Sequence, residues 1–175
     1  MLNRTKKVVE SKFSLLVNLG IIIVPDDCVA GTELASLNKK DFYYCNENLT
    51  DKNFSNPSRI LKPGDKFSVK AFKQNFSGTT TSQERLGFLA TFPNAVLLGA
   101  QGGSLVYKQK RSELPKGYWY ASFDKNGKLW KDSDGNHRVP NVYAYTDGDF
   151  VFNLGYFEGD WHESCVLLCF YEESV

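Results

Sequence analysis

The chain has 175 residues, with 21 basic and 20 acidic side chains and a net charge of +1. Its apolar share of 42 % and aromatic share of 14 % are enough for a sizeable core and exclude a disordered chain. Because nucleic-acid binding requires a clustered basic face, we expect no nucleic-acid partner. The length favours a single domain over residues 1–175.

The N-terminal part, residues 1–60, is predicted to contain strands and turns. Residues 1–25 are rich in Leu, Val and Ile and predict one or two core strands. The apolar run at 13–24 follows several basic residues, as in a signal peptide, but Glu10 and Lys12 interrupt the charged part. The run is also too short to span a bilayer as a helix. We therefore expect no signal peptide, no membrane insertion and, by default, a cytoplasmic location.

The next segments predict strands and two helices. Residues 42–44 form a short aromatic strand, and LKPGDKFSVKAFKQ predicts a turn and then a strand with Phe67, Val69 and Ala71 on one side. A Ser or Thr cap followed by Gln and Glu in SQERL predicts a helix start. A second, half-buried helix is predicted in GGSLVYKQKRSELP, opening after Gly103-Ser104 and stopped by Pro115.

From residue 116 onwards the pattern is typical of short strands. YWYASFD and KLWKD are aromatic, strand-like pieces joined by a turn at 124–127. The order of strands, two helices and more strands predicts an α+β fold, with two helices packed on short, mainly antiparallel strands.

The segment from 139 to 173 combines two kinds of residue. Phe150, Phe152 and Leu154 alternate with polar or smaller residues, which predicts a strand with one face in the core. The same alternation upstream places Val142 and Ala144 in the core. The outward-facing set is Asn141, Tyr143, Tyr145, Asp149, Val151, Asn153, Tyr156, Gly159, Asp160, His162, Glu163 and Ser164.

The composition of the outward set favours a binding face. Tyr supplies a large amphipathic contact area at low entropic cost, and short polar residues adapt their hydrogen bonds to a ligand. An ordinary solvated sheet face would hold more Lys, Glu and Thr, whereas this set has no Lys or Arg. We therefore predict that these twelve residues bind a ligand.

Metal and cofactor motifs are weak. Asp132, Asp134 and Asn136 alternate as in a calcium loop, but Gly135 falls two places too early and Tyr143 stands where a bidentate Glu belongs. A turn bonded by its own side chains is the preferred interpretation. The four cysteines form no CxxC pattern and are expected to be buried free thiols. We predict no metal and no cofactor.

Two enzymatic alternatives stay open. The chain has no nucleophile elbow and no phosphate-binding loop, so catalysis is not the first expectation. A hydrolase would require His162 to approach a carboxylate such as Asp160 or Glu163. The other alternative follows from a family resemblance.

Two stretches carry that resemblance: SQERLGFLATFPNAVLLGAQGGSLVYKQKRSELPKGYWYASFD and HRVPNVYAYTDGDFVFNLGYFEGDWHESCVLLCFYEE. Across residues 60 to 173 the chain resembles the variable proteins of diversity-generating retroelements, of archaeal or candidate-phylum bacterial type. The resemblance is most specific in its last third.

This resemblance implies a C-type-lectin fold whose C-terminal region, here 139–173, is rewritten at template adenines. It implies a monomer that binds a macromolecular ligand, expected to be a protein, without catalysis. Trp161 and Glu163 are not reachable from AAC codons, so Trp161 is interpreted as frame. The chain lacks the Glu-Pro-Asn and Trp-Asn-Asp triplets of calcium-dependent lectins. A related branch makes formylglycine, but Cys165 and Cys169 lie roughly 13 Å apart along one strand.

Overall fold

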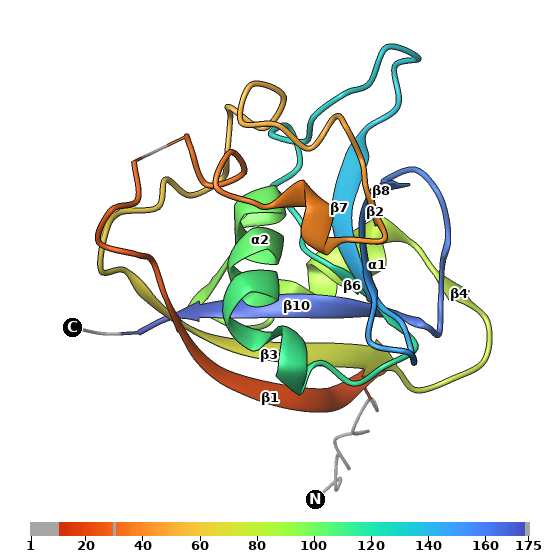
Figure 1. Cartoon of the computed structure of the whole chain (residues 1–175). Helices are drawn as coiled ribbons and strands as arrows, with labels where there is room; N and C mark the ends of the chain where they lie inside the picture. The colour runs from red at the N-terminus through yellow and green to blue at the C-terminus, as the bar shows by residue number, and fades with distance from the viewer. Residues whose placement is uncertain (1–10, 30, 174–175) are drawn as a thin grey trace, which may run out of the picture.

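A computed structural model of the chain describes residues 11–29 and 31–173 (Figure 1). The helices are α1 (Ser82–Leu89) and α2 (Gly99–Lys110), with 3₁₀ turns at Lys39–Asp41 and Arg111–Glu113. The strands are β1 (Phe13–Ile23), β2 (Tyr44–Cys45), β3 (Lys66–Gln74), β4 (Thr79–Thr80), β5 (Ala95–Val96), β6 (Tyr118–Ala121), β7 (Arg138–Ala144), β8 (Phe150–Tyr156), β9 (Trp161–His162) and β10 (Cys165–Glu172).

The main sheet contains eight strands and is mixed. Its order is β1-β3-β10-β6-β7-β8-β2, with β5 pairing to β10, and β4 and β9 form a separate two-stranded sheet. The pairs β10–β6 and β2–β8 are parallel, and the remaining pairs are antiparallel. The prediction of an α+β fold with two helices and mainly antiparallel strands is confirmed.

One face of the sheet packs against α2 and against the segment between β1 and β3, residues 24–65. In Figure 1, α2 crosses in front of β10 and β3. Phe67, Val69 and Ala71 of β3 all point into this core, as their alternation predicts. Val142 and Phe152 contribute to the same core from β7 and β8. The apolar half of the 139–173 pattern therefore forms the main core.

The opposite face carries a second, smaller core. Cys165, Leu167 and Cys169 of β10 point into it, one residue out of phase with the β10 residues of the main core. Leu86 and Leu89 of α1 cover it. Because this second core covers only part of the face, the rest of β7 and β8 is left without a helix on it.

The first helix begins as the sequence predicts. Thr81 accepts a hydrogen bond from the Glu84 amide, and the Glu84 side chain accepts one from the Thr81 amide, which is a complete capping box. The prediction for α2 was wrong at its start. The helix begins at Gly99, not after Ser104, and Gly102 and Gly103 lie inside it.

Glycines enter α2 because its backbone approaches the sheet closely. A Cβ atom at Gly102 would stand 2.6 Å from Leu98 Cβ and 2.7 Å from Phe170 Cζ. A second local prediction was also wrong: KLWKD forms turns instead of a strand, apart from one bridge between Lys131 and His137. Trp130 in that segment packs on Phe54, with 5.7 Å between ring centroids.

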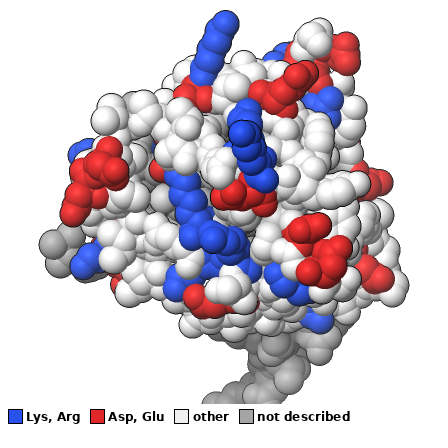
Figure 2. Space-filling view, in the orientation of Figure 1, with Lys and Arg blue, Asp and Glu red and all other residues white. Residues whose placement is uncertain are grey.

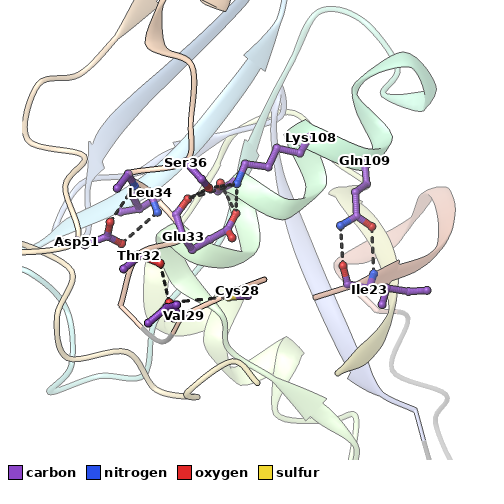
Figure 3. A network of polar contacts seen from close by, with 12 residues as sticks. Ile23, Cys28, Val29, Thr32, Glu33, Leu34, Ser36, Asp51, Lys108 and Gln109 are labelled. Carbon is purple, nitrogen blue, oxygen red and sulfur yellow. Dashed lines mark hydrogen bonds and ion pairs between the residues drawn. The ribbon is translucent and has the colours of Figure 1, made fainter. Parts of the chain in front are cut away.

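At one end of the edge strand β1, a side chain forms hydrogen bonds with the strand backbone. The Gln109 amide accepts a hydrogen bond from the Ile23 N–H and donates one to the Ile23 carbonyl (Figure 3). Gln109 thus pairs with the edge as a neighbouring strand would, which protects part of it from pairing with another chain.

Charges of both signs are interspersed on the face that carries α2 (Figure 2). Within residues 11–29 and 31–173, no helix is both long and apolar enough to cross a membrane.

Candidate functional site

The site lies on the uncovered part of the sheet, on the face opposite α2. Register brings residues of three strands together there: Trp119 of β6 pairs with Tyr143 of β7, and Tyr143 pairs with Val151 of β8. Asn141 pairs with Asn153 across the same two strands. Their neighbours in sequence are core residues on the other face. The strands therefore hold these side chains on a rigid support.

Aromatic rings form a continuous row across this surface. Trp119 packs on Tyr143 with 4.6 Å between ring centroids, and Tyr143 meets Tyr145 edge to face, also at 4.6 Å. Tyr145 in turn meets Tyr43, at 6.1 Å. Tyr43 is 76 % exposed. A row of rings with one highly exposed end offers a large contact area that loses little entropy on binding.

The row ends at a hollow of about 340 Å³. Strands β6, β7, β8 and β10 and the segment between β8 and β10 surround it. Its lining residues are Trp119, Asn141, Asn153, Leu154, Gly155, Tyr156, Gly159, Asp160, Trp161, His162 and Cys165. Six of these eleven belong to the predicted binding set of twelve, so the hollow brings together half of that set.

Two asparagines present different polar groups to the hollow. The Asn153 Oδ1 accepts a hydrogen bond from Asn46 Nδ2 at 3.0 Å, which leaves the Asn153 amide hydrogens for other partners. Asn141 is only 5 % exposed, and its Oδ1 is buried without a hydrogen-bond partner in the described part of the chain. A buried acceptor without a partner costs about 1–3 kcal/mol, so it requires a reason.

Gly155 shapes the wall of the hollow. A Cβ atom at this position would stand 2.9 Å from Asn141 Nδ2 and 3.0 Å from Trp161 Cη2. The absence of a side chain thus lets Asn141 and Trp161 lie directly against the β8 backbone. A hydrogen bond fixes the orientation of the Trp161 ring, because its Nε1–H donates to Ser82 Oγ at 2.7 Å.

A buried arginine holds the segment that carries Trp161 and His162. Arg85 of α1 is fully buried, and it donates to Thr80 Oγ1, to Gln74 Oε1 and to the Cys165 carbonyl at 2.6 Å. It also donates to the His162 carbonyl at 3.4 Å. Burial lowers the pKa of Arg85 to about 10, so it stays charged at neutral pH. One side chain therefore joins α1, β3 and both ends of the β9–β10 turn.

The His162 ring contacts a hydroxyl and a thiol. Its Nδ1 lies 2.7 Å from Ser164 Oγ, and its Nε2 lies 3.7 Å from Cys165 Sγ. No described carboxylate hydrogen-bonds to this ring, in contrast to what the hydrolase alternative requires. Burial raises the pKa of the Cys165 thiol, and nearby Arg85 offsets this only in part. The thiol is therefore protonated near neutral pH.

The other predicted residues occupy the surroundings of the hollow. Tyr143 and Tyr145 belong to the aromatic row, and Asp149 is exposed at the end of the β7–β8 turn. Val151 points to the binding face but is only 5 % exposed, so its own contact area is small. Glu163 and Ser164 line a second, polar hollow of about 730 Å³, together with residues such as Lys73 and Lys116.

Sequence reasoning missed Trp119, Tyr43 and Gly155. Trp119 alternates with Tyr118 and Tyr120 in YWYA, so period two places it opposite the fully buried Tyr120. That pattern was readable, but nothing in it says that β6 lies beside β7. The same applies to Tyr43, which reaches the site through the parallel pairing of β2 with β8.

The acidic turn at 132–136 bonds to itself, as preferred from the sequence. Asp132 Oδ1 accepts from the amides of Asp134 and Asn136, and its Oδ2 accepts from Arg138. In the described ranges, no three His, Cys, Asp or Glu side chains gather as metal ligands would. All four cysteines are free thiols; Cys165 and Cys169 are buried, whereas Cys28 and Cys45 are half-buried.

No protein-family model, no curated protein and no solved structure matches this chain.

Proposed function

We propose that the protein is a ligand-binding protein with a C-type-lectin-like fold, one of the variable proteins of diversity-generating retroelements. Its ligand is a macromolecule, a protein, and the binding surface is the aromatic row with the adjoining hollow. The observation that carries this proposal is the row from Tyr43 through Tyr145 and Tyr143 to Trp119. Aromatic residues on rigid strands are typical of protein-binding surfaces.

The alternation of core residues and open-face residues along β7 and β8 supports diversification. Val142 and Phe152 are core residues, whereas their partners in alternation, Tyr143 and Asn153, lie on the open face. Residues on that face can therefore change without altering the core. A surface of this kind keeps its scaffold while its contacts vary.

Catalysis has less support from the geometry. The hydrolase alternative needs a carboxylate at His162, but the ring contacts Ser164 and Cys165. A cysteine nucleophile needs a thiolate, and burial raises the pKa of Cys165. Cys165 and Cys169 share a face of β10 but are separated by roughly 13 Å of strand, which disfavours joint action in formylglycine formation.

The first test compares two sets of substitutions. Replacing Tyr143, Asn153 and Tyr156 together by Ser should lower the Tm by no more than a few degrees, because these side chains lie outside the cores. The matched control replaces one main-core residue, Phe152, by Ser and should unfold the protein. A large loss of Tm in the triple variant would show that the face is structural and would contradict the proposal.

The second test concerns diversification itself. We expect the neighbouring DNA to hold a near-copy of the codons for residues 139–170, differing only where the copy has adenine, beside a reverse-transcriptase gene. Genomic sequencing around the gene checks this. If the neighbourhood holds neither, diversification is contradicted, although binding through the aromatic row remains testable by the substitutions.

A further inference from the structure

We propose that the hollow at the end of the aromatic row is an anchoring pocket for an arginine side chain of the protein ligand. This inference rests on the proposed function, because it assumes a protein ligand, and it names the group that the ligand inserts. Three features of the hollow carry it: its hydrogen-bond acceptors, its charge and its indole walls.

The hollow offers acceptors to a ligand that donates hydrogen bonds. Asn141 Oδ1 is buried and has no partner in the described structure. Asp160, an exposed residue of the segment between β8 and β9, adds a carboxylate to the lining. A guanidinium carries five N–H donors and no acceptor, so it pairs with acceptor groups of this kind. Bonds from a charged donor are about twice as strong as neutral ones.

The charge around the hollow selects a cation over an anion. Its lining includes the Asp160 carboxylate and contains no Lys or Arg. The second hollow differs in this respect, since Lys73 and Lys116 both line it. A carboxylate or phosphate in the first hollow would lie beside Asp160 without a basic partner. The two hollows are therefore distinguished by the charge of the group that each would accept.

The walls suit a planar cation. Trp119 and Trp161, from β6 and β9, both line the hollow, and guanidinium groups stack on indole faces. Tyr156 is already covered on one face by Arg138, whose Cζ lies 3.7 Å from the ring centroid. Arg85 Cζ likewise lies 5.5 Å from the centroid of the Trp161 ring. The indole of Trp119, on which no described Lys or Arg stacks, is therefore the main wall that a ligand cation would use. The volume of about 340 Å³ is at the lower end for small-molecule sites, which fits one side chain.

A matched pair of probes tests the charge and shape of the pocket. N-acetylarginine methylamide is titrated into the ¹⁵N-labelled protein, and N-acetylcitrulline methylamide serves as the neutral isostere. The chain has three tryptophans, so three indole N–H signals report the result. We expect arginine to bind with millimolar affinity and to shift the Trp119 and Trp161 signals. The Trp130 signal should stay in place, because Trp130 packs on Phe54 outside the hollow.

Variants assign the binding to the acceptors. Asn141→Ala should weaken arginine binding about tenfold, since it removes an acceptor from a charged donor. Asp160→Asn should weaken it about threefold, as expected for an exposed ion pair. Asp134→Asn is the control, because this exposed carboxylate does not line the hollow, and it should leave the affinity unchanged.

Filling the pocket gives an independent test. Gly155→Ala places a methyl group against Asn141 and Trp161 and should abolish arginine binding. A thermal melt of each variant confirms that it is folded; if Gly155→Ala does not fold, the Asn141 and Asp160 variants decide.

Equal binding of citrulline and arginine, binding of the matched glutamate derivative instead, or arginine binding unaffected by Asn141→Ala would overturn the inference. So would the absence of any shift up to about 50 mM probe, a limit set at roughly fifty times a Kd of about 1 mM. These failures would leave the proposed function intact if the triple Ser variant still folds. Failure of that triple variant would count against the binding face itself.

Discussion

Arg85 is a cation enclosed in the protein, and among the described residues no carboxylate forms an ion pair with it. Four acceptors surround it instead, and the rings of Trp161 and Phe13 lie 5.5 Å and 5.8 Å from its Cζ. This residue connects the second core to the hollow, because it holds the His162 and Cys165 carbonyls at the two ends of the β9–β10 turn. This role could not be predicted from the sequence, since a single Arg in a short helix is usually exposed.

Replacing Arg85 by Met should lower the free energy of unfolding by about 3 kcal/mol or more. The substitution removes the Arg85 donor from the buried Cys165 carbonyl and leaves Gln74 Oε1 with Thr80 Oγ1 as its remaining donor. Urea unfolding at pH 7 measures the change. Arg111→Met on the exposed end of α2 is the control and should stay within about 0.5 kcal/mol of the parent protein. Equal stability of the Arg85 and Arg111 variants would contradict the structural role.

At the scale of elements, local signals were readable and packing signals were not. The capping box of α1 was recognisable because all of its atoms come from residues 81–84. The start of α2 was not, because Gly102 and Gly103 disfavour a helix locally, and only their close approach to Phe170 and Phe152 explains them. The strand prediction for KLWKD was wrong for a similar reason: Trp130 packs on Phe54 in a loop instead of entering the sheet.

Two glycine substitutions in helices should have opposite effects. Gly102→Ala in α2 should lower the free energy of unfolding by about 2 kcal/mol, because the new Cβ would lie too close to Leu98 and Phe170. Gly87→Ala in α1 is its matched control: nothing lies within 4 Å of the added Cβ, so it should gain about 0.5–1 kcal/mol. Chemical unfolding of both variants checks the signs, and a gain at Gly102 would contradict the packing argument.

The contact between α2 and the segment between β1 and β3 depends on one buried carboxyl group, that of Glu33. Glu33 is 4 % exposed, and it accepts hydrogen bonds from Ser104 and from Lys108, which also reaches Ser36 (Figure 3). Lys108→Met should cost about 3 kcal/mol, because the buried Glu33 carboxyl would lose this partner. Adding Glu33→Gln to this variant should restore part of the loss.

A thermodynamic cycle of these variants measures the coupling. Lys110→Met is the control, since among the described residues Lys110 pairs only with the exposed Glu113, and it should cost less than about 1 kcal/mol. If Lys108→Met costs no more than Lys110→Met, the buried Lys108–Glu33 pair does not hold the segment between β1 and β3 on α2.

For the whole molecule, one buried carboxyl links distant parts of the chain and makes stability depend on pH. Asp124, just after β6, accepts hydrogen bonds from the amide and hydroxyl of Ser58 and lies against Gly99 at the start of α2. Burial raises the pKa of Asp124 to about 6, although the bonds from Ser58 partly oppose this. The folded protein thus holds this proton more tightly than the unfolded chain does.

Asp124 should therefore destabilise the protein increasingly as pH rises from about 4, where the unfolded chain loses the proton, to above 6. The Asp124→Asn variant cannot ionise, so its stability relative to the parent protein should rise by about 3 kcal/mol between pH 4 and pH 7. Urea unfolding across this range measures the difference. Parallel curves for the two proteins would show that the carboxyl titrates alike in both states.

The candidate site was readable in part at this scale. Alternation identified Tyr143 and Asn153 as outward-facing because it depends only on neighbours in sequence. Trp119 and Tyr43 join them through pairings between distant strands, and one sequence does not specify strand order. Arg85 and Gly155 matter because of what lies next to them in space, which no pattern along the chain records.

The position of β10 also bears on how the protein is made. This strand, residues 165–172, lies between β3 and β6 near the middle of the sheet, yet of the strands in this sheet it is the last to leave the ribosome. Until then β3 and β6 have no shared neighbour, and both hydrophobic cores lack their β10 residues. Such long-range pairings fold slowly and expose strand edges meanwhile. A nascent chain that stalls before residue 165 would therefore be a substrate for chaperones.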